Sequence, residues 1–185
     1  MLRKLLVPLL ALTMCGATAT VAQAATAHHP LDGVRRATAR FHSSAVAEAH
    51  GYARLVDTAG IACIDMPGAG GMGVHHVSGA LVEDGRITAL RPEAMVYEPG
   101  AHGRLRLVAV EYVVLQSVWD AAHRRPPARF GRRFDLTASP NRFGLPAFYS
   151  LHAWVWKRNP AGTFAMWNPR VSCPAGGSAA VHAHH

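Results

Sequence analysis

The sequence predicts an α+β domain, in which an N-terminal helix is followed by a mainly antiparallel sheet that could curve into a barrel-like form. Three observations lead to this class. Apolar residues near the start of the mature chain recur at helical spacing, short apolar runs separated by turn residues follow them, and the strand–helix alternation typical of a parallel sheet does not occur.

Residues 1–24 have the pattern of a secretory signal peptide. A positive start at Arg3 and Lys4 precedes an apolar stretch, and Ala22-Gln23-Ala24 forms a small-x-small cleavage site. Cleavage after Ala24 predicts a secreted or periplasmic protein in an oxidising compartment.

Two alternatives for the leader are weaker. Cleavage after Ala27 would leave His28 as a terminal residue able to chelate copper, but the segment before Pro30 is more simply an unstructured end. Lipidation of Cys15 is disfavoured, because the preceding Met14 is not small.

The mature chain predicts a single domain. We expect an unstructured start at 25–33, one globular α+β domain over 34–173 and an unstructured histidine-rich tail over 174–185. Its other apolar runs are too short to cross a bilayer, so we expect no transmembrane segment in the mature protein.

The first half of the domain predicts one helix and one short strand. Apolar residues at three- and four-residue steps predict a helix over 34–55, which Gly51 could end early. A short strand is expected at 59–63. The glycine-rich segment 67–73 predicts a loop, and it lacks the lysine and hydroxyl residues of a phosphate-binding loop.

The second half predicts strands joined by turns. Gly100 to Gly103 is expected to turn a hairpin, and Asn159 to Gly162 is expected to form another turn. One short helix is expected at 117–123. The predicted strands are 73–79, 94–97, 104–115, 147–157 and a returning strand at 164–167.

Cys63 and Cys173 are an even pair in the mature chain, and an oxidising compartment favours a disulfide between them. Such a bond would join the C-terminal segment to the first strand region. Because neither cysteine has a close cysteine neighbour, metal or redox chemistry at sulfur is the weaker interpretation.

Loss of Arg3 and Lys4 with the leader lowers the formal charge from +8 to +6. This balance favours loose association with anionic envelope polymers. The densest positive pairs, Arg124-Arg125 and Arg132-Arg133, are too short for a nucleic-acid footprint, so we do not expect nucleic-acid binding.

Five polar residues interrupt the apolar strands and are the candidates for a site. Alternation along a strand allows only one of His75 and His76 to face a given pocket, and Glu111 lies in the most apolar strand, where an isolated carboxylate would be costly. From the residues alone, the candidates are one of His75 and His76 together with Glu111 and His152, followed by Glu93 and Glu98.

If the strands around 75, 111 and 152 are neighbours, two imidazoles and a carboxylate converge. Such a set suits one divalent metal (Zn, Fe, Mn or Cu), a small ligand or general acid–base work, so whether the protein is an enzyme stays open. The plainer alternative is that Glu111 pairs with an arginine. The histidines at both chain ends could also scavenge metal ions weakly.

The rival hypothesis is a non-catalytic envelope or surface interaction protein. Trp154 and Trp156 share one face of an unbroken strand, and with Arg132 and Arg133 they would form an exposed recognition face. The sequence does not fix the oligomeric state.

Several short sequence motifs in the chain resemble those of a family of secreted bacterial proteins that has no assigned activity. They are Gly71-Met72-Gly73-Val74-His75-His76, Arg91-Pro92-Glu93-Ala94-Met95-Val96-Tyr97-Glu98-Pro99, Val110-Glu111-Tyr112, Leu151-His152-Ala153-Trp154-Val155-Trp156-Lys157, Asn159-Pro160 and Trp167-Asn168-Pro169. The resemblance runs from about residue 37 to 173. Family members carry tyrosine where this chain has His76, which favours His75 as the shared site residue. The resemblance implies a common polar site without naming its activity.

Overall fold

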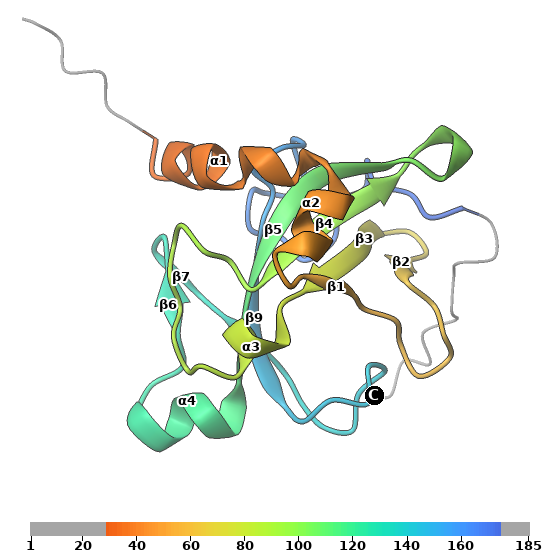
Figure 1. Ribbon diagram of the computed structural model, residues 1–185. Helices are drawn as coiled ribbons and strands as arrows, with labels where there is room; N and C mark the ends of the chain where they lie inside the picture. Colours follow the sequence, from red (N-terminus) through yellow and green to blue (C-terminus); the bar gives the residue numbers. More distant parts are fainter. Residues whose placement is uncertain (1–28, 175–185) are drawn as a thin grey trace, which may run out of the picture.

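The computed structural model describes residues 29–174. Its centre is a seven-stranded antiparallel sheet in the order β1-β3-β4-β5-β9-β8, in which β2 also pairs with β3 (Figure 1). The predicted α+β class is confirmed, and the sheet stays open rather than closing into a barrel. Its strands are β1 (Ala53–Arg54), β2 (Cys63–Met66), β3 (Gly70–Val77), β4 (Ala94–Pro99), β5 (Leu105–Leu115), β8 (Asp135–Thr137) and β9 (Phe148–Ala153).

The helix expected over 34–55 is divided into α1 (Asp32–Thr38), the 3-10 helix η1 (Ala39–His42) and α2 (Ser44–Ala49). Ser43 adopts an extended conformation between η1 and α2, with φ −89° and ψ 115°, and this breaks the helix. The start expected to be unstructured, 25–33, lies partly outside the described residues. Within it, α1 begins at Asp32 and Leu31 is buried.

The remaining elements are short and lie in the connections. They are α3 (Gly79–Val82), the 3-10 helix η2 (Ala101–Gly103) in the predicted β4–β5 hairpin turn, α4 (Gln116–Ala122), and a separate two-stranded sheet of β6 (Ala128–Arg129) and β7 (Arg132–Arg133). None of the described helices is long and apolar enough to span a membrane.

The N-terminal helices cover one face of the central strands (Figure 1). Val34 and Phe41 belong to the same buried cluster as Val110 and Tyr112 of β5. Burying one such side chain stabilises the fold by about 1.5–3 kcal/mol. The Tyr97 hydroxyl donates a hydrogen bond to the Phe41 carbonyl at 2.8 Å, which joins η1 to β4. Since side chains alternate along β5, Glu111 between Val110 and Tyr112 faces the other side of the sheet.

Two predicted strands differ from the structure. Strand β9 ends at Ala153, four residues before the end expected, because the backbone N–H of Trp154 turns to the Thr163 carbonyl at 2.9 Å. The returning strand expected at 164–167 is not formed in this described segment. There the Trp154 indole N–H donates to the Ala165 carbonyl at 2.6 Å, so the turn is held by a side chain instead of a strand ladder.

The short strand expected at 59–63 begins at Cys63 instead. One Asp57 carboxylate oxygen accepts hydrogen bonds from the backbone N–H groups of Ala59 and Ile61, at 2.9 and 2.8 Å. These bonds hold 57–61 as a turn, a common arrangement for aspartate. The loop expected over 67–73 is also shorter, since β3 already begins at Gly70.

The predicted disulfide between Cys63 and Cys173 is present and links residues 110 positions apart. It joins β2 to the C-terminal segment, which also contacts β3 through a bridge between Gly71 and Asn168. Closing a loop of this length stabilises a fold by roughly 4–5 kcal/mol in the chain-entropy model.

Gly73 allows β3 to approach β4 closely, two residues before His75. Its φ is +101°, and a Cβ atom at this position would collide with the carbonyl oxygen of Tyr97. Glycine is therefore required where β3 enters the sheet.

Candidate functional site

Three strands bring His75, Glu111 and His152 together on the sheet face opposite the helices. Glu111 of β5 pairs directly with His152 of β9. His75 of β3 is separated from β5 by β4, which places Val96 opposite His75 and Ala94 opposite Glu111. Because Ala94 and Val96 are small, the longer side chains of His75 and Glu111 meet above β4.

The three side chains form a closed ring of contacts. Nε2 of His75 lies 3.2 Å from Nε2 of His152 and 3.4 Å from Oε2 of Glu111. Nδ1 of His152 lies 3.3 Å from Oε1 of Glu111. One ligand atom from each residue can be chosen so that all three lie within 4.8 Å of one another.

One arrangement of the ring protons, consistent with these distances, would leave three donor atoms free for a metal ion. When Nδ1–H of His152 donates to Oε1 of Glu111, the lone pair of His152 lies on Nε2 and points towards His75. His75 also hydrogen-bonds to the backbone of Gly73. With the proton of His75 on Nδ1, its Nε2 lone pair would face Glu111 and His152. Nε2 of both histidines and Oε2 of Glu111 would then each offer a lone pair within the ring of contacts.

Burial disfavours charge on each of the three groups. It lowers the pKa of His75 and of His152 to about 4, so both imidazoles are neutral at pH 7. Burial raises the pKa of Glu111, against the opposing effects of His75 and of a hydrogen bond with Ser150. Within residues 29–174, the Glu111 carboxylate lies within 3.4 Å of these two neutral histidines and forms an ion pair with no lysine or arginine. The alternative of an arginine partner for Glu111 is therefore wrong.

The separations fit a divalent metal ion. With bonds of about 2.0–2.1 Å, the ligand atoms of a tetrahedral zinc site are roughly 3.3 Å apart. The His75–His152 and His75–Glu111 distances, 3.2 and 3.4 Å, match this spacing. Two imidazoles and a carboxylate are also the ligands of catalytic zinc sites and of mononuclear iron sites that keep open positions.

The ring of contacts lies in a cavity of about 410 Å³. This volume is within the usual range of small-molecule sites, about 300–1,000 Å³. The walls are mainly apolar and come from β3, β5, β9 and the loop that precedes β9. They include Val77, Val113, Leu115, Phe143, Leu145 and Phe148.

Trp154 supports the site from the interior. Its ring stacks on the ring of His152, with centroids 6.1 Å apart and planes 16° from parallel. Trp154 is 3% exposed and packs with Val96 and Val108. A buried aromatic neighbour of this kind restricts the rotation of the His152 ring.

The expected recognition face of tryptophans and arginines does not form. Trp154 is buried, and Trp156 is half-buried, with its indole N–H donating to the Thr38 hydroxyl at 3.2 Å. Arg132 and Arg133 are exposed on β7, in the separate small sheet. Trp154 is therefore not a surface residue, and Trp156 is only partly exposed.

Glu93 lies outside the ring of contacts, although it is buried. Its Oε2 atom accepts a hydrogen bond from the backbone N–H of Val113 at 3.0 Å. Burial raises the pKa of Glu93 to about 8, so the side chain is mainly protonated at neutral pH. Glu93 therefore acts as a structural hydrogen-bonding group at the start of β4.

Glu98 is also separate from the ring. Its carboxylate oxygens accept hydrogen bonds from Nζ of Lys157 at 2.6 and 2.8 Å. One of them also accepts a hydrogen bond from a guanidinium nitrogen of Arg106 at 2.6 Å. Lys157 is largely buried, whereas Arg106 is 67% exposed along its side chain. This group is an ion pair that joins β4 to the segment after β9.

His76 faces the other side of the sheet from His75. Its ring contacts Tyr97, with centroids 4.9 Å apart, and its Nδ1 lies 3.6 Å from Oε1 of the exposed Glu48. Neither ring nitrogen has a hydrogen-bond partner among the residues that the structure describes. Of the two adjacent histidines, His75 is the one in the cavity.

A second ion pair, which the sequence did not indicate, holds one wall of the cavity. A guanidinium nitrogen of Arg142 lies 2.7 Å from Oδ2 of Asp57, and the Thr58 N–H donates to the Arg142 carbonyl at 2.9 Å. These two contacts connect the loop over 138–147 to the turn at Asp57. The loop carries Phe143 and Leu145, which line the cavity. Since 85 positions separate Arg142 and Asp57, no local sequence pattern reports the contact.

Comparisons with models of known protein families, with curated proteins and with solved structures found no match to this chain. The fold and the site define a small α+β protein with a buried two-histidine, one-carboxylate cluster. The predicted cleavage sites, Cys15, His28 and the tail histidines lie outside the described residues.

Proposed function

We propose that this protein binds one divalent transition-metal ion through Nε2 of His75, Nε2 of His152 and Oε2 of Glu111. The observation that carries the proposal is the pair of distances from His75, 3.2 Å to His152 and 3.4 Å to Glu111. We propose zinc as the ion, because these separations match the ligand spacing of a tetrahedral zinc site. Iron, manganese and copper can use the same donors.

Charge supports a cation at this position. Two neutral imidazoles and an ionised Glu111 would leave one negative charge in a mainly apolar cavity, which is costly without a partner. The raised pKa of Glu111 reflects this cost. A divalent ion would stabilise the carboxylate and would use the lone pairs of both histidines.

Glu111 would serve the ion in two ways. Its Oε2 atom would bind the metal, while Oε1, 3.3 Å from Nδ1 of His152, would accept the Nδ1–H and hold that ring with Nε2 directed inwards. A carboxylate that orients a metal-binding histidine through its second nitrogen is a common feature of metal sites.

Three protein ligands leave at least one position open to the cavity. A bound metal ion would supply Lewis-acid activation of water or of a carbonyl group there. We therefore propose metal-dependent hydrolysis of a small ester or amide as the activity. If the protein holds no metal, the Glu111–His152 pair would instead favour general acid–base catalysis.

Metal analysis of matched variants tests the site. Untagged protein is purified, incubated with zinc and dialysed, and its zinc content is measured by mass spectrometry. We expect His152→Ala to lose about one zinc per chain relative to the wild type, and His50→Ala, which alters an exposed histidine after α2, to lose none. Equal zinc in the wild type and His152→Ala would contradict the proposal.

We also propose that the protein acts outside the cytoplasm. The Cys63–Cys173 disulfide fits an oxidising compartment, as does the predicted signal peptide. Recovery from a bacterial periplasm or culture medium with residue 25 at the N-terminus would support cleavage after Ala24.

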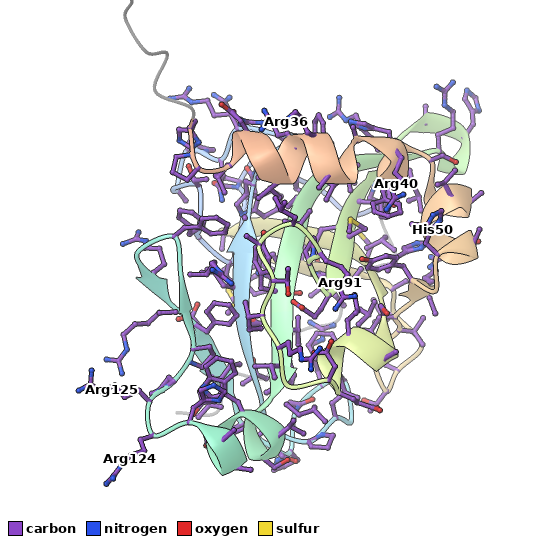
Figure 2. The ribbon with its side chains drawn as sticks, turned by 60° about the vertical axis from the view of Figure 1, so that its left-hand side comes forward. Arg36, Arg40, His50, Arg91, Arg124 and Arg125 are labelled. Carbon is purple, nitrogen blue, oxygen red and sulfur yellow. A yellow bond between two sulfur atoms is a disulfide. The ribbon has the colours of Figure 1, made fainter. Side chains whose placement is uncertain are left out.

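The rival candidate is binding to an anionic envelope polymer through surface arginines. Figure 2 shows Arg124 and Arg125 projecting beyond α4, and Arg36 and Arg40 lying along the N-terminal helices. Such binding would weaken steeply as salt is raised and would fall in Arg124→Ala/Arg125→Ala. Salt-independent binding would contradict this candidate.

A further inference from the structure

The cavity changes from polar to apolar along two paired strands. On the cavity face, β5 and β9 place Glu111 opposite His152, then Val113 opposite Ser150, then Leu115 opposite Phe148. All six residues line the cavity. Each step of two residues advances about 6.7 Å along the sheet, so the last pair lies roughly 13 Å from the first.

The other walls extend the apolar part. Phe143 and Leu145 come from the loop fastened by Arg142, and Phe143 contacts the ring of Phe148 with centroids 6.2 Å apart. Val77 of β3 continues the sequence of side chains that begins with His75. Beyond the cluster, the cavity wall is therefore mainly hydrocarbon, with Ser150 and Thr137 as uncharged polar residues.

The charged residues that line the cavity outside the cluster do not favour a ligand with a charged group at its other end. Arg54 and Glu83 line it, are exposed and carry opposite charges. The remaining polar side chains in the lining, Thr137 and Ser150, carry no charge. Among residues 29–174, the cluster of His75, Glu111 and His152 is the one group of three metal-binding side chains that converge, and it lies in the cavity.

We infer that the ligand of this site is an unbranched, medium-length fatty acid whose carboxylate binds the metal ion. The chain would extend from Glu111 and His152 past Val113 to Leu115 and Phe148. A path of about 13 Å holds roughly eight to ten carbons, because C–C bonds of about 1.5 Å advance an extended chain by about 1.3 Å per carbon. The head-group assignment depends on the proposed metal site, whereas the apolar path does not.

Calorimetric titration with straight-chain acids tests the inference. Zinc-loaded protein is titrated with butyrate, hexanoate, octanoate and decanoate, and the zinc content of the same sample is measured. Each added methylene is expected to lower Kd about three- to fourfold, so octanoate should bind about 100-fold more tightly than butyrate. Removal of zinc should weaken the binding of every acid.

Two matched variants test where the hydrocarbon chain of the fatty acid lies in the cavity. Leu115→Asp places a charge at the apolar end and should abolish the dependence on chain length while zinc content stays at the wild-type value. Leu136→Asp alters an exposed residue of β8 outside the cavity lining and should behave as the wild type. Lower octanoate affinity in both variants would overturn the assignment of the path.

The outcomes separate the two proposals. A protein that binds zinc but has the same affinity for butyrate and octanoate would overturn the fatty-acid inference and leave the metal site standing. A protein that binds no zinc would overturn the proposed function and the head-group assignment. Titration of that protein with the same series of acids would still decide whether the apolar path binds the hydrocarbon chain of the ligand.

Discussion

Glu111 and His152 lie directly opposite one another on β5 and β9, with Oε1 3.3 Å from Nδ1. This register holds one carboxylate oxygen against a histidine and leaves the other, Oε2, 3.4 Å from Nε2 of His75. One glutamate can therefore orient one histidine and share a bound ion with both.

Glu111→Gln should weaken zinc binding by at least 100-fold without unfolding the protein. Glutamine keeps the size of the side chain but removes the ligand charge, and burial already disfavours the ionised carboxylate in the metal-free fold. Competition with a chromophoric zinc chelator measures the affinity, and thermal unfolding of metal-free protein checks the fold. Unchanged zinc affinity would remove Glu111 from the ligand set.

Glu98→Gln should lower the stability of the fold and leave zinc binding unchanged, the reverse of Glu111→Gln. Loss of this carboxylate leaves Lys157, whose side chain is 19% exposed, without its partner, so the free energy of unfolding should fall by about 1–3 kcal/mol. Zinc content should not change, because Glu98 lies outside the ring of contacts. Urea denaturation and metal analysis of the same sample check both statements, and a loss of zinc with unchanged stability would contradict them.

Glu93 should make the stability of the protein depend on pH. Its pKa is raised from 4.5 to about 8 in the folded state, so the native state holds a proton that the unfolded state releases between these values. This contribution to stability is fully present below pH 4.5 and is lost as pH rises through 8.

Glu93→Gln tests that dependence. Glutamine stays neutral and can still accept the Val113 N–H, so the variant should gain on the wild type by about 1 kcal/mol per pH unit between pH 5 and 8. Urea denaturation at pH 5, 6.5 and 8 gives the difference. A difference that is the same at all three values would show that Glu93 is ionised in the fold.

Arg142→Ala should loosen the cavity wall at the loop over 138–147. The Asp57 side chain is 2% exposed and would keep its two backbone hydrogen bonds but lose its cationic partner, at a cost of about 1–3 kcal/mol. Hydrogen exchange should increase in the loop. Arg91→Ala breaks a 3.5 Å surface pair with Asp84 and should cost less than about 1 kcal/mol. Equal effects of the two substitutions would contradict the role of Arg142.

The sequence predicts the site residues better than it predicts their surroundings. The apolar strand around Glu111 and alternation along the strands selected Glu111, His152 and one of His75 and His76, because a buried carboxylate needs partners, and the family resemblance favoured His75. Alternation could not show that β4 lies between β3 and β5, or that Ala94 and Val96 leave room for the contact.

The errors arise where tertiary contacts override local patterns. Trp154 continues the alternation of β9 in the sequence, but its backbone N–H bonds to Thr163 and its ring enters the interior. Ser43 breaks a helix that apolar spacing made continuous. The pairing of Arg142 with Asp57 depends on two turns that meet only after folding.

Zinc-edge X-ray absorption of the full chain carrying one equivalent of zinc tests the metal site most directly. We expect two imidazole nitrogens at about 2.0–2.1 Å with oxygen ligands completing the shell, and one imidazole in place of two in His75→Ala. A spectrum with the same number of imidazoles in the wild type and His75→Ala would place the zinc on other histidines and contradict the proposed site.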